Sequence, residues 1–207
     1  MKLFNKNLII IIRHGERADM IENVNLDNLK CGKYDSELTQ RGKSQAYEAG
    51  EEIKEFLESN EINLKKLEQE KKIKLLSSPF ARTLMTSHHL LKGLELSTPI
   101  TIEKGLCEHF NAKWYPIHPE NFLVYEKQEN SPEKNFLYSE INYNSIICES
   151  KASLPKRPET HEECANRLKS VYNDITKFYF QECGYKIMFL VTHFLPIEVF
   201  FKLYSNV

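Results

Sequence analysis

The sequence predicts an α/β fold, a three-layer α/β/α sandwich with a mainly parallel central sheet. Two observations lead to this prediction. Short, uninterrupted apolar runs recur along the chain, and stretches with helical periodicity separate them. Strands that alternate with helices form a parallel sheet that helices cover on both faces.

Four apolar runs are expected to be strands. The first, 8–12, contains one leucine and four isoleucines, which suits a central strand buried on both faces better than a short helix. Similar runs lie at 73–76 and 187–191, and a weaker, shorter one spans 99–103. These runs supply the strands of the predicted sheet.

Three helices are expected between the strands. The first follows Thr39, whose hydroxyl suits an N-cap. The second is expected to begin at Ser78-Pro79, because proline at the first helical position has no amide to leave unsatisfied, and to close at Gly93. The third begins with a capping box, Thr160 to Glu163. Its apolar face is marked by Cys164, Leu168, Val171, Tyr172, Ile175 and Tyr179.

Two long stretches, 18–38 and 111–158, match neither pattern. The first is polar and irregular, and the second carries five prolines and seven aromatic residues. Structureless stretches of this length are uncommon in a compact domain and often shape a functional site. We therefore expect both of them to border the site.

Composition limits the classes of function. The 207 residues include 28 Lys and Arg against 29 Asp and Glu, a formal net charge of −1, so no overall basic field attracts nucleic acid or an anionic membrane. The length fits a single domain, 1–207. The apolar run that ends at Arg13 is too short to span a membrane. The five cysteines are widely spaced without a CxxC pair, which indicates neither disulfides nor a zinc site and favours a cytoplasmic protein.

Candidate functional residues follow three of the predicted strands. They are Arg13-His14-Gly15-Glu16-Arg17, Ser77-Ser78-Pro79 with Arg82 one helical turn later, and Thr192-His193. Ligands of open α/β sheets bind beyond the carboxyl ends of the strands. Two histidines and three arginines are therefore expected to converge there, a set suited to holding an anion.

These residues resemble the motifs of the histidine phosphatase superfamily, also called phosphoglycerate mutase-like. Arg13-His14-Gly15 matches the family's RHG motif at the end of its first strand. Residues that match D-x-x-L-T-x-x-G-x-x-Q-A are Asp35, Leu38, Thr39, Gly42, Gln45 and Ala46. Residues that match S-S-P-x-x-R-x-x-x-T are Ser77, Ser78, Pro79, Arg82 and Thr86. Glu108 falls at the family's acidic position and His193 at its second histidine, so the resemblance runs in order along nearly the whole chain.

Within the superfamily, the chain resembles the phosphatase branch. Glu16-Arg17 is similar to the R-H-G-E-R opening of the suppressor of T-cell-receptor signalling phosphatases, and Glu108 with Trp114 is similar to their E-W-x-x-W stretch. The mutase branch tends to follow RHG with a serine and a tryptophan-asparagine pair, which are absent here. A phosphatase is therefore favoured over a mutase.

The resemblance implies a role for each candidate. His14 would be the nucleophile that forms a phosphohistidine. Arg13, Arg17 and Arg82 would bind the phosphoryl oxygens. His193, as an imidazolium, would donate a hydrogen bond to the transferring group. The family usually has a small residue after this histidine, whereas Phe194 stands here.

Glu108 would protonate the leaving oxygen and later accept a proton from the attacking water. Glu103 and Glu120 are rivals for this role. Ordinary structural roles are the alternatives for the other candidates: a histidine satisfied at a strand end, and arginines in surface ion pairs, with Glu16 as a partner.

We thus expect a phosphomonoester hydrolase without a metal or cofactor. Its substrate would be a small phosphate ester or a phosphoprotein. Two alternatives stay open: a catalytically weak protein that binds a phosphorylated ligand or acts as a scaffold, and a phosphoglycerate-type mutase.

Overall fold

The computed structural model describes residues 7–141, 146–148 and 153–204. Residues 1–6 and 205–207, together with 142–145 and 149–152 of the second irregular stretch, lie outside this part. Within it, five parallel strands form one sheet in the order β1-β5-β2-β3-β4. They are β1 (Leu8–Arg13), β2 (Ile73–Ser77), β3 (Ile100–Ile102), β4 (Ile146–Cys148) and β5 (Ile187–Thr192). The four expected strands are confirmed, while β4, only three residues long, was not anticipated.

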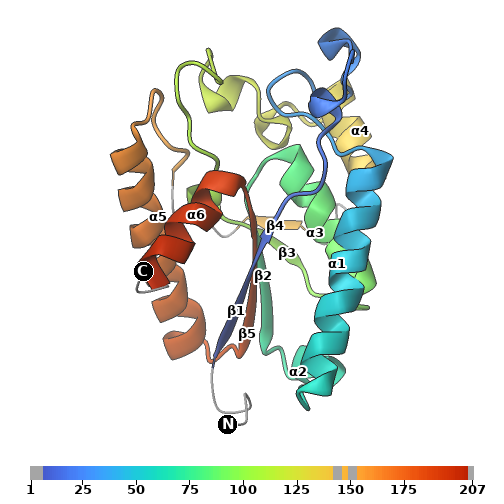
Figure 1. Cartoon of the computed structure of the whole chain (residues 1–207), viewed down its shortest axis with the longest axis vertical. Coiled ribbons are helices and arrows are strands. Elements are labelled where there is room, and N and C mark those ends of the chain that lie inside the picture. Colours follow the sequence, from blue (N-terminus) through green and yellow to red (C-terminus); the bar gives the residue numbers. More distant parts are fainter. Residues whose placement is uncertain (1–6, 142–145, 149–152, 205–207) are drawn as a thin grey trace.

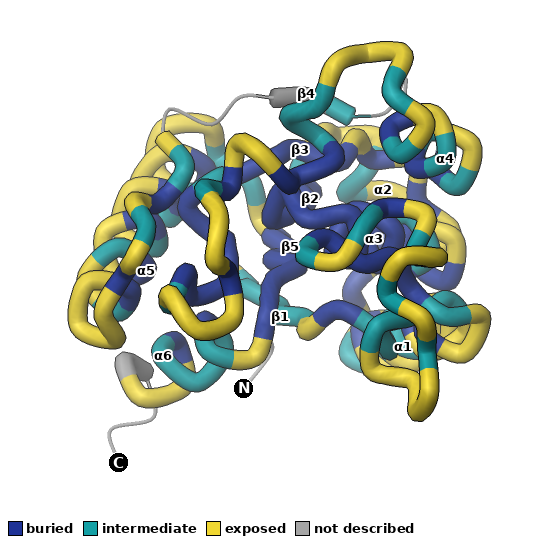
Figure 2. The backbone as a smooth tube through the Cα atoms, turned by 90° about the horizontal axis from the view of Figure 1, so that it is seen from above, coloured by how far each residue is buried: buried dark blue, intermediate teal, exposed yellow. Residues whose placement is uncertain are grey.

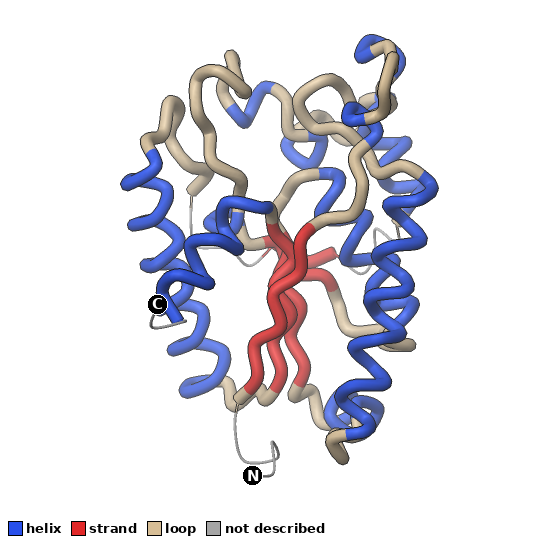
Figure 3. The backbone as a smooth tube through the Cα atoms, viewed as in Figure 1, coloured by secondary structure: helices blue, strands red, loops and turns tan. Residues whose placement is uncertain are grey.

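Helices cover both faces of the sheet, which confirms the predicted three layers (Figures 1 and 3). On one side lie α1 (Gln40–Ser59), α2 (Leu64–Gln69), α3 (Ala81–Gly93) and α4 (Pro132–Glu140). On the other lie α5 (His161–Ile175), which continues into a π-helical segment (Thr176–Glu182), and α6 (Phe194–Tyr204). The irregular stretches contain, besides α4, the 3-10 turns Ala18–Met20, Leu26–Asn28, Pro119–Asn121 and Val124–Glu126, and another turn, Lys104–Leu106, follows β3.

Alternate side chains of the strands pack into the two helical layers. Along β5, Phe189 and Val191 face α1 and α3, whereas Met188 and Leu190 face α5 and α6. Figure 2 shows the inner strands and α3 buried between the exposed outer faces of α1 and α5. Both faces of the sheet are therefore apolar.

The first strand lies at an edge of the sheet, so the expectation that it is central was wrong. β1 pairs with β5 alone, and its side chains are half-buried. Its apolar run reflects burial by helices on both faces, a condition that edge and central strands share. The central position belongs to β2, between β5 and β3.

Side-chain caps begin two of the predicted helices where expected. The Gly42 amide donates to Thr39 Oγ1 (2.8 Å) at the start of α1. Thr160 and Glu163 form the reciprocal capping box of α5. Both caps confirm the sequence prediction.

The start of α3 differs from its prediction. The helix begins at Ala81 instead of Ser78-Pro79, because Phe80 has an extended backbone (φ −66°, ψ 140°). The Ala81 amide donates to Asp35 Oδ1 (2.8 Å). A carboxylate from a distant loop therefore caps this helix, which the local sequence could not indicate.

Gly93 ends α3, as predicted, but it serves chiefly to let α3 approach α1. A Cβ atom on Gly93 would lie 2.1 Å from the Tyr47 carbonyl oxygen, and one on Gly50 would lie 2.4 Å from the Leu90 carbonyl oxygen. The two helices thus cross with backbone against backbone, and this packing needs glycine on both of them.

We predict that Gly93→Ala lowers the free energy of unfolding by roughly 1–3 kcal/mol, because the methyl group would force the helices apart. Without that clash, replacing glycine by alanine would stabilise the helix by about 1 kcal/mol. The sign of the change in unfolding free energy therefore shows whether the clash exists. Urea unfolding measures the effect. The exposed neighbour provides the control Lys92→Ala. Equal stability of the two variants would contradict the packing argument.

Candidate active site

The carboxyl ends of three adjacent strands form the floor of the candidate site. The His14 amide donates to the Thr192 carbonyl (3.0 Å), and the Ser78 amide donates to the Val191 carbonyl (3.0 Å). The residues that follow β1, β2 and β5 are thereby tied together above the sheet, at the end where Figure 1 shows the long loops. The structure thus brings these distant segments together.

His14 is buried, with 8% of its surface exposed, and its ring is held in one orientation. Nδ1 lies 2.8 Å from the Gly15 carbonyl oxygen. A carbonyl can only accept, so Nδ1 carries the proton, and Nε2 keeps a lone pair when the ring is neutral. The Gly15 amide donates to Thr86 Oγ1 (3.1 Å), which fixes the backbone that orients the ring.

The environment of His14 strongly favours its neutral form. Burial, followed by the positive charges of Arg82, Arg17 and Arg13, lowers the pKa of His14 from 6.5 to about 2. The Gly15 carbonyl opposes this shift in part. His14 is therefore an unprotonated nitrogen base at any pH above about 3.

Arg82 is fully buried beside the two histidines. Its Nη2 atom donates to His193 Nδ1 (3.1 Å) and to the Tyr115 hydroxyl (3.3 Å). The Phe80 ring packs against the guanidinium, 4.0 Å from Cζ to the ring centroid. Among the described residues, Nε and Nη1 of Arg82 have no hydrogen-bond partner. A buried cation with two unused donors suits an oxyanion.

His193 is fully buried, and both of its ring nitrogens contact residues that follow β2. Its Nδ1 accepts from Arg82, so its Nε2 carries the proton and donates to Ser78 Oγ (2.9 Å). Burial, followed by the charge of Arg82, lowers the pKa of His193 well below its ordinary value. His193 is therefore a neutral imidazole in this arrangement. The His193 and His14 ring centroids lie 5.4 Å apart.

Phe194, the bulky residue after the second histidine, points away from this cluster. Its side chain is 57% exposed, and the Arg13 guanidinium lies 5.3 Å from its ring centroid. Arg13 is itself exposed. The phenylalanine therefore packs against an arginine at the surface.

Arg17 is bound to Asp19 and not to Glu16, the partner named for its structural alternative. Its Nε donates to Asp19 Oδ1 (2.9 Å), and its Nη2 contacts the other carboxylate oxygen. Glu16 instead accepts from Thr39 Oγ1 (2.7 Å) and lies 3.7 Å from Arg41. The fork on Asp19 fixes the direction of the Arg17 side chain.

Glu108 lies on the loop after the turn Lys104–Leu106 and is 8% exposed. Its Oε1 atom accepts from the His109 amide (3.0 Å). Its negative charge contributes to raising the pKa of both Arg17 and Tyr115. In each case burial and other neighbours contribute more. Glu108 therefore shares the electrostatic environment of the histidine and arginine cluster.

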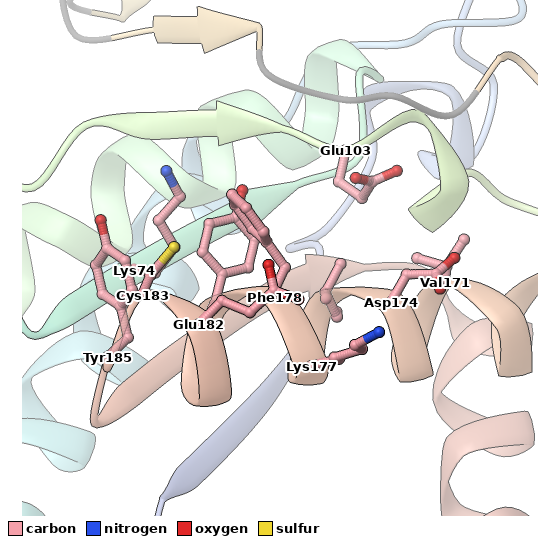
Figure 4. Close-up of a pocket in the computed structure, with 11 residues that line it drawn as sticks. Lys74, Glu103, Val171, Asp174, Lys177, Phe178, Glu182, Cys183 and Tyr185 are labelled. Carbon is pink, nitrogen blue, oxygen red and sulfur yellow. The ribbon is translucent and has the colours of Figure 1, made fainter.

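The two rival carboxylates lie elsewhere. Glu103 Oε1 accepts from the Gly105 amide (2.8 Å), and the side chain lines a cavity of about 720 Å³ between the sheet and α5. Figure 4 shows Glu103 at one end of this cavity near Val171, with Tyr185 at the other end. None of the candidate site residues lines it. Glu120 has a side chain that is 68% exposed and pairs with His118 (3.7 Å).

Two residues of the site had no role in the sequence analysis. Asp35, which matched a family motif, is fully buried and accepts from the Ala81 and Val124 amides (2.8 Å each). Its Oδ1 atom lies 3.9 Å from Arg82 Nη1. Burial raises the pKa of Asp35 to about 6, opposed by Arg82 and the two amides. Tyr115 had been noted only as one of seven aromatic residues, and aromatic enrichment was the sole signal for it.

The described part of the chain shows neither a cluster of metal-ligating side chains nor a membrane-spanning helix. It contains no group of three or more His, Cys, Asp or Glu side chains that could hold a metal ion. Its helices include none that is long and apolar enough to cross a membrane.

Solved structures share this fold at low sequence identity. An ecdysone phosphate phosphatase from Bombix mori is 19% identical, with a TM-score of 0.61 over 98% of this chain and 80% of that chain. A phosphoglycerate mutase from Bacillus anthracis is 16% identical, with a TM-score of 0.58 over 100% and 83%. A phosphoserine phosphatase from Entamoeba histolytica is 20% identical, with a TM-score of 0.51 over 95% and 79%. Phosphatases and a mutase therefore share the architecture.

Sequence comparison identifies the family. A stretch of 56 residues is 41% identical to phosphoglycerate mutase 3 of Saccharomyces cerevisiae, although it spans only 27% of this chain and 17% of the yeast protein. The model of the histidine phosphatase superfamily (branch 1) matches residues 9–207. With the phosphoglycerate mutase-like architecture described above, this match shows that the chain belongs to branch 1 of the histidine phosphatase superfamily.

Proposed function

We propose that residues 1–207 form a single catalytic domain that hydrolyses phosphomonoesters through a phosphohistidine on His14. One observation carries the proposal. A neutral, buried histidine with an unprotonated Nε2 lies in a cluster with a buried arginine that has two unused donors. The pair provides a nucleophile for phosphorus and a cation for the phosphoryl oxygens.

The first step moves the phosphoryl group to the enzyme. His14 Nε2 attacks phosphorus in line with the leaving oxygen, and the bond between phosphorus and that oxygen breaks. Arg82 stabilises the charge on the phosphoryl oxygens, assisted by Arg13 and Arg17. Glu108 protonates the leaving oxygen.

The second step releases phosphate. Water attacks the phosphohistidine, Glu108 accepts the proton of that water, and the bond between phosphorus and Nε2 breaks. A phosphoryl dianion raises the pKa of a nearby histidine, since an opposite charge favours the imidazolium. In this proposal, His193 therefore becomes a donor to the phosphoryl group as the substrate binds.

A phosphatase is preferred to the alternatives. The Glu16-Arg17 pair after the RHG motif is the feature that resembles the suppressor of T-cell-receptor signalling phosphatases. The hydrogen bond from Arg17 to Asp19, which orients the Arg17 side chain, supports a binding role for it in this proposal. The proposed substrate is a small phosphate ester or a phosphoprotein, and the proposed location of the reaction is the cytoplasm. A protein that only binds such a ligand would keep the arginines without needing a free His14 Nε2.

His14→Asn should abolish hydrolysis of 4-nitrophenyl phosphate, with a loss of at least about 1,000-fold in kcat, because the nucleophile is removed. Release of 4-nitrophenolate measures the rate, and acid quenching followed by mass spectrometry detects the phosphohistidine in the parent protein. His88→Asn replaces a half-buried histidine on α3 and serves as the control. Equal rates in the parent protein and His14→Asn would remove His14 from the mechanism.

Glu108→Gln should slow phenyl phosphate by at least about 10-fold more than 4-nitrophenyl phosphate, since the poorer leaving group depends more on protonation. The kcat for both esters is compared with that of Glu103→Gln, which changes the carboxylate in the separate cavity. A uniform loss for both esters, or a matching effect of Glu103→Gln, would refute the assignment of Glu108 as the acid.

The neutral His14 ring should also make the fold sensitive to acid. Between pH 7 and pH 5 the unfolded histidine binds a proton, whereas the folded ring, with a pKa of about 2, does not. This difference lowers the free energy of unfolding by about 2 kcal/mol over that interval. In His14→Asn, the unfolding free energy measured with urea should lack this contribution to its decrease between pH 7 and pH 5. Parallel pH dependence of the two proteins would show that folding does not suppress protonation of His14.

A further inference from the structure

Arg167 on α5 donates hydrogen bonds to the loop that carries Glu108. Its side chain is only 14% exposed. Nη1 donates to the carbonyls of Gly105 (2.6 Å) and Cys107 (3.1 Å). Nη2 lies within 3.4 Å of the carbonyl of Glu108 itself. One guanidinium therefore binds the backbone of the loop up to and including the proposed acid.

Glu159 holds that guanidinium and also binds the other side of the loop. Its two carboxylate oxygens accept from Arg167 Nε (2.7 Å) and Nη2 (2.8 Å) in a bidentate pair. Its backbone amide donates to the Phe110 carbonyl (3.0 Å), and its carbonyl oxygen lies 2.6 Å from His109 Nε2. Residues before and after Glu108 are thus fixed to the same ion pair.

The turn packs tightly on α5 one helical turn further along. A Cβ atom on Gly105 would lie 2.2 Å from Val171 Cγ2. Glycine at this position lets the turn approach the helix closely enough for its carbonyls to reach Arg167. The Glu108 loop is therefore built against α5, with little room to shift.

The N–H groups of Arg167 are all directed at acceptors within the protein. A guanidinium has five N–H groups, and those of Arg167 are directed at three carbonyls, the Glu159 carboxylate and Cys164 Sγ (3.3 Å). Burial lowers the pKa of Arg167, but the opposing contributions, led by the hydrogen bond to Glu159, together outweigh it, so the net shift is upward and the group stays charged. It has no donor left for a substrate, unlike Arg82.

We propose that Arg167 and Glu159 are positioning residues that set the place of the Glu108 carboxyl group for proton transfer. This inference rests on the proposed function. General acid catalysis requires the acid within hydrogen-bond reach of the leaving oxygen, and a displacement of about 1 Å can cost on the order of 100-fold in rate. A buried ion pair is weak evidence for a role in stability alone.

The test compares leaving groups in variants of α5. Arg167→Lys keeps the positive charge but cannot form the bidentate pair with Glu159. Arg167→Gln loses both the charge and the pair. We expect each to lower kcat for phenyl phosphate about 10-fold or more while changing kcat for 4-nitrophenyl phosphate by less than about 3-fold, with KM nearly constant for both. Lys169→Gln, which replaces an exposed cation on the same helix, should match the parent protein.

A double variant separates positioning from general support of the fold. If Arg167 acts through Glu108, then Glu108→Gln with Arg167→Gln should be no slower than Glu108→Gln alone. Additive losses, or equal losses for both esters in Arg167→Lys, would overturn the positioning role. Thermal unfolding and formation of phosphohistidine from 4-nitrophenyl phosphate establish that each variant is folded. Turnover by the parent protein that does not depend on His14 would instead overturn the proposed function, and the positioning role with it.

Discussion

The buried charge of Arg82 is the constraint on which the site depends. A guanidinium without exposed surface is costly unless its surroundings compensate it. Asp35 supplies a countercharge at 3.9 Å, Phe80 a ring face, and His193 and Tyr115 two acceptors. This compensation is incomplete because two nitrogens have no partner among the described residues. The two unpaired nitrogens of Arg82 therefore form a positively charged group, suited to an anion, at the carboxyl edge of the sheet.

That same charge shapes the chemistry of both histidines. Burial is the largest cause of the lowered pKa of His14 and of His193, and Arg82 is the next in each case. In the proposed mechanism, one cation therefore attracts the phosphoryl oxygens and also helps keep His14 unprotonated. In ordinary water a histidine would be partly charged near pH 6.5 and would lose nucleophilic strength.

Much of the fold could be predicted because its signals are local. The runs that form β2 and β5 and the caps at Thr39 and Thr160 depend on neighbouring residues. Features set by distant contacts could not be predicted in this way. The edge position of β1, the start of α3 after Phe80 and the contact between α1 and α3 all depend on what folds against them.

The site shows the same division. Motif order indicated which strands end in candidate residues, and the structure brings those strands together. The neutral state of His193 depends on an arginine donor that reaches one of its ring nitrogens, and the partner of Arg17 depends on the path of a loop. Arg167 carries no motif signal in the sequence, because its importance comes from backbone carbonyls that lie 59 to 62 positions away.

The position of Asp35 has a consequence for motion. Its two oxygens are shared between the first residue of α3 and the turn Val124–Glu126, while the residue itself belongs to the loop before α1. Three segments distant in sequence thus have one common anchor, so none can detach without exposing a buried charge. Local unfolding around the site should be cooperative, with amide hydrogens of Ala81 and Val124 exchanging with solvent together.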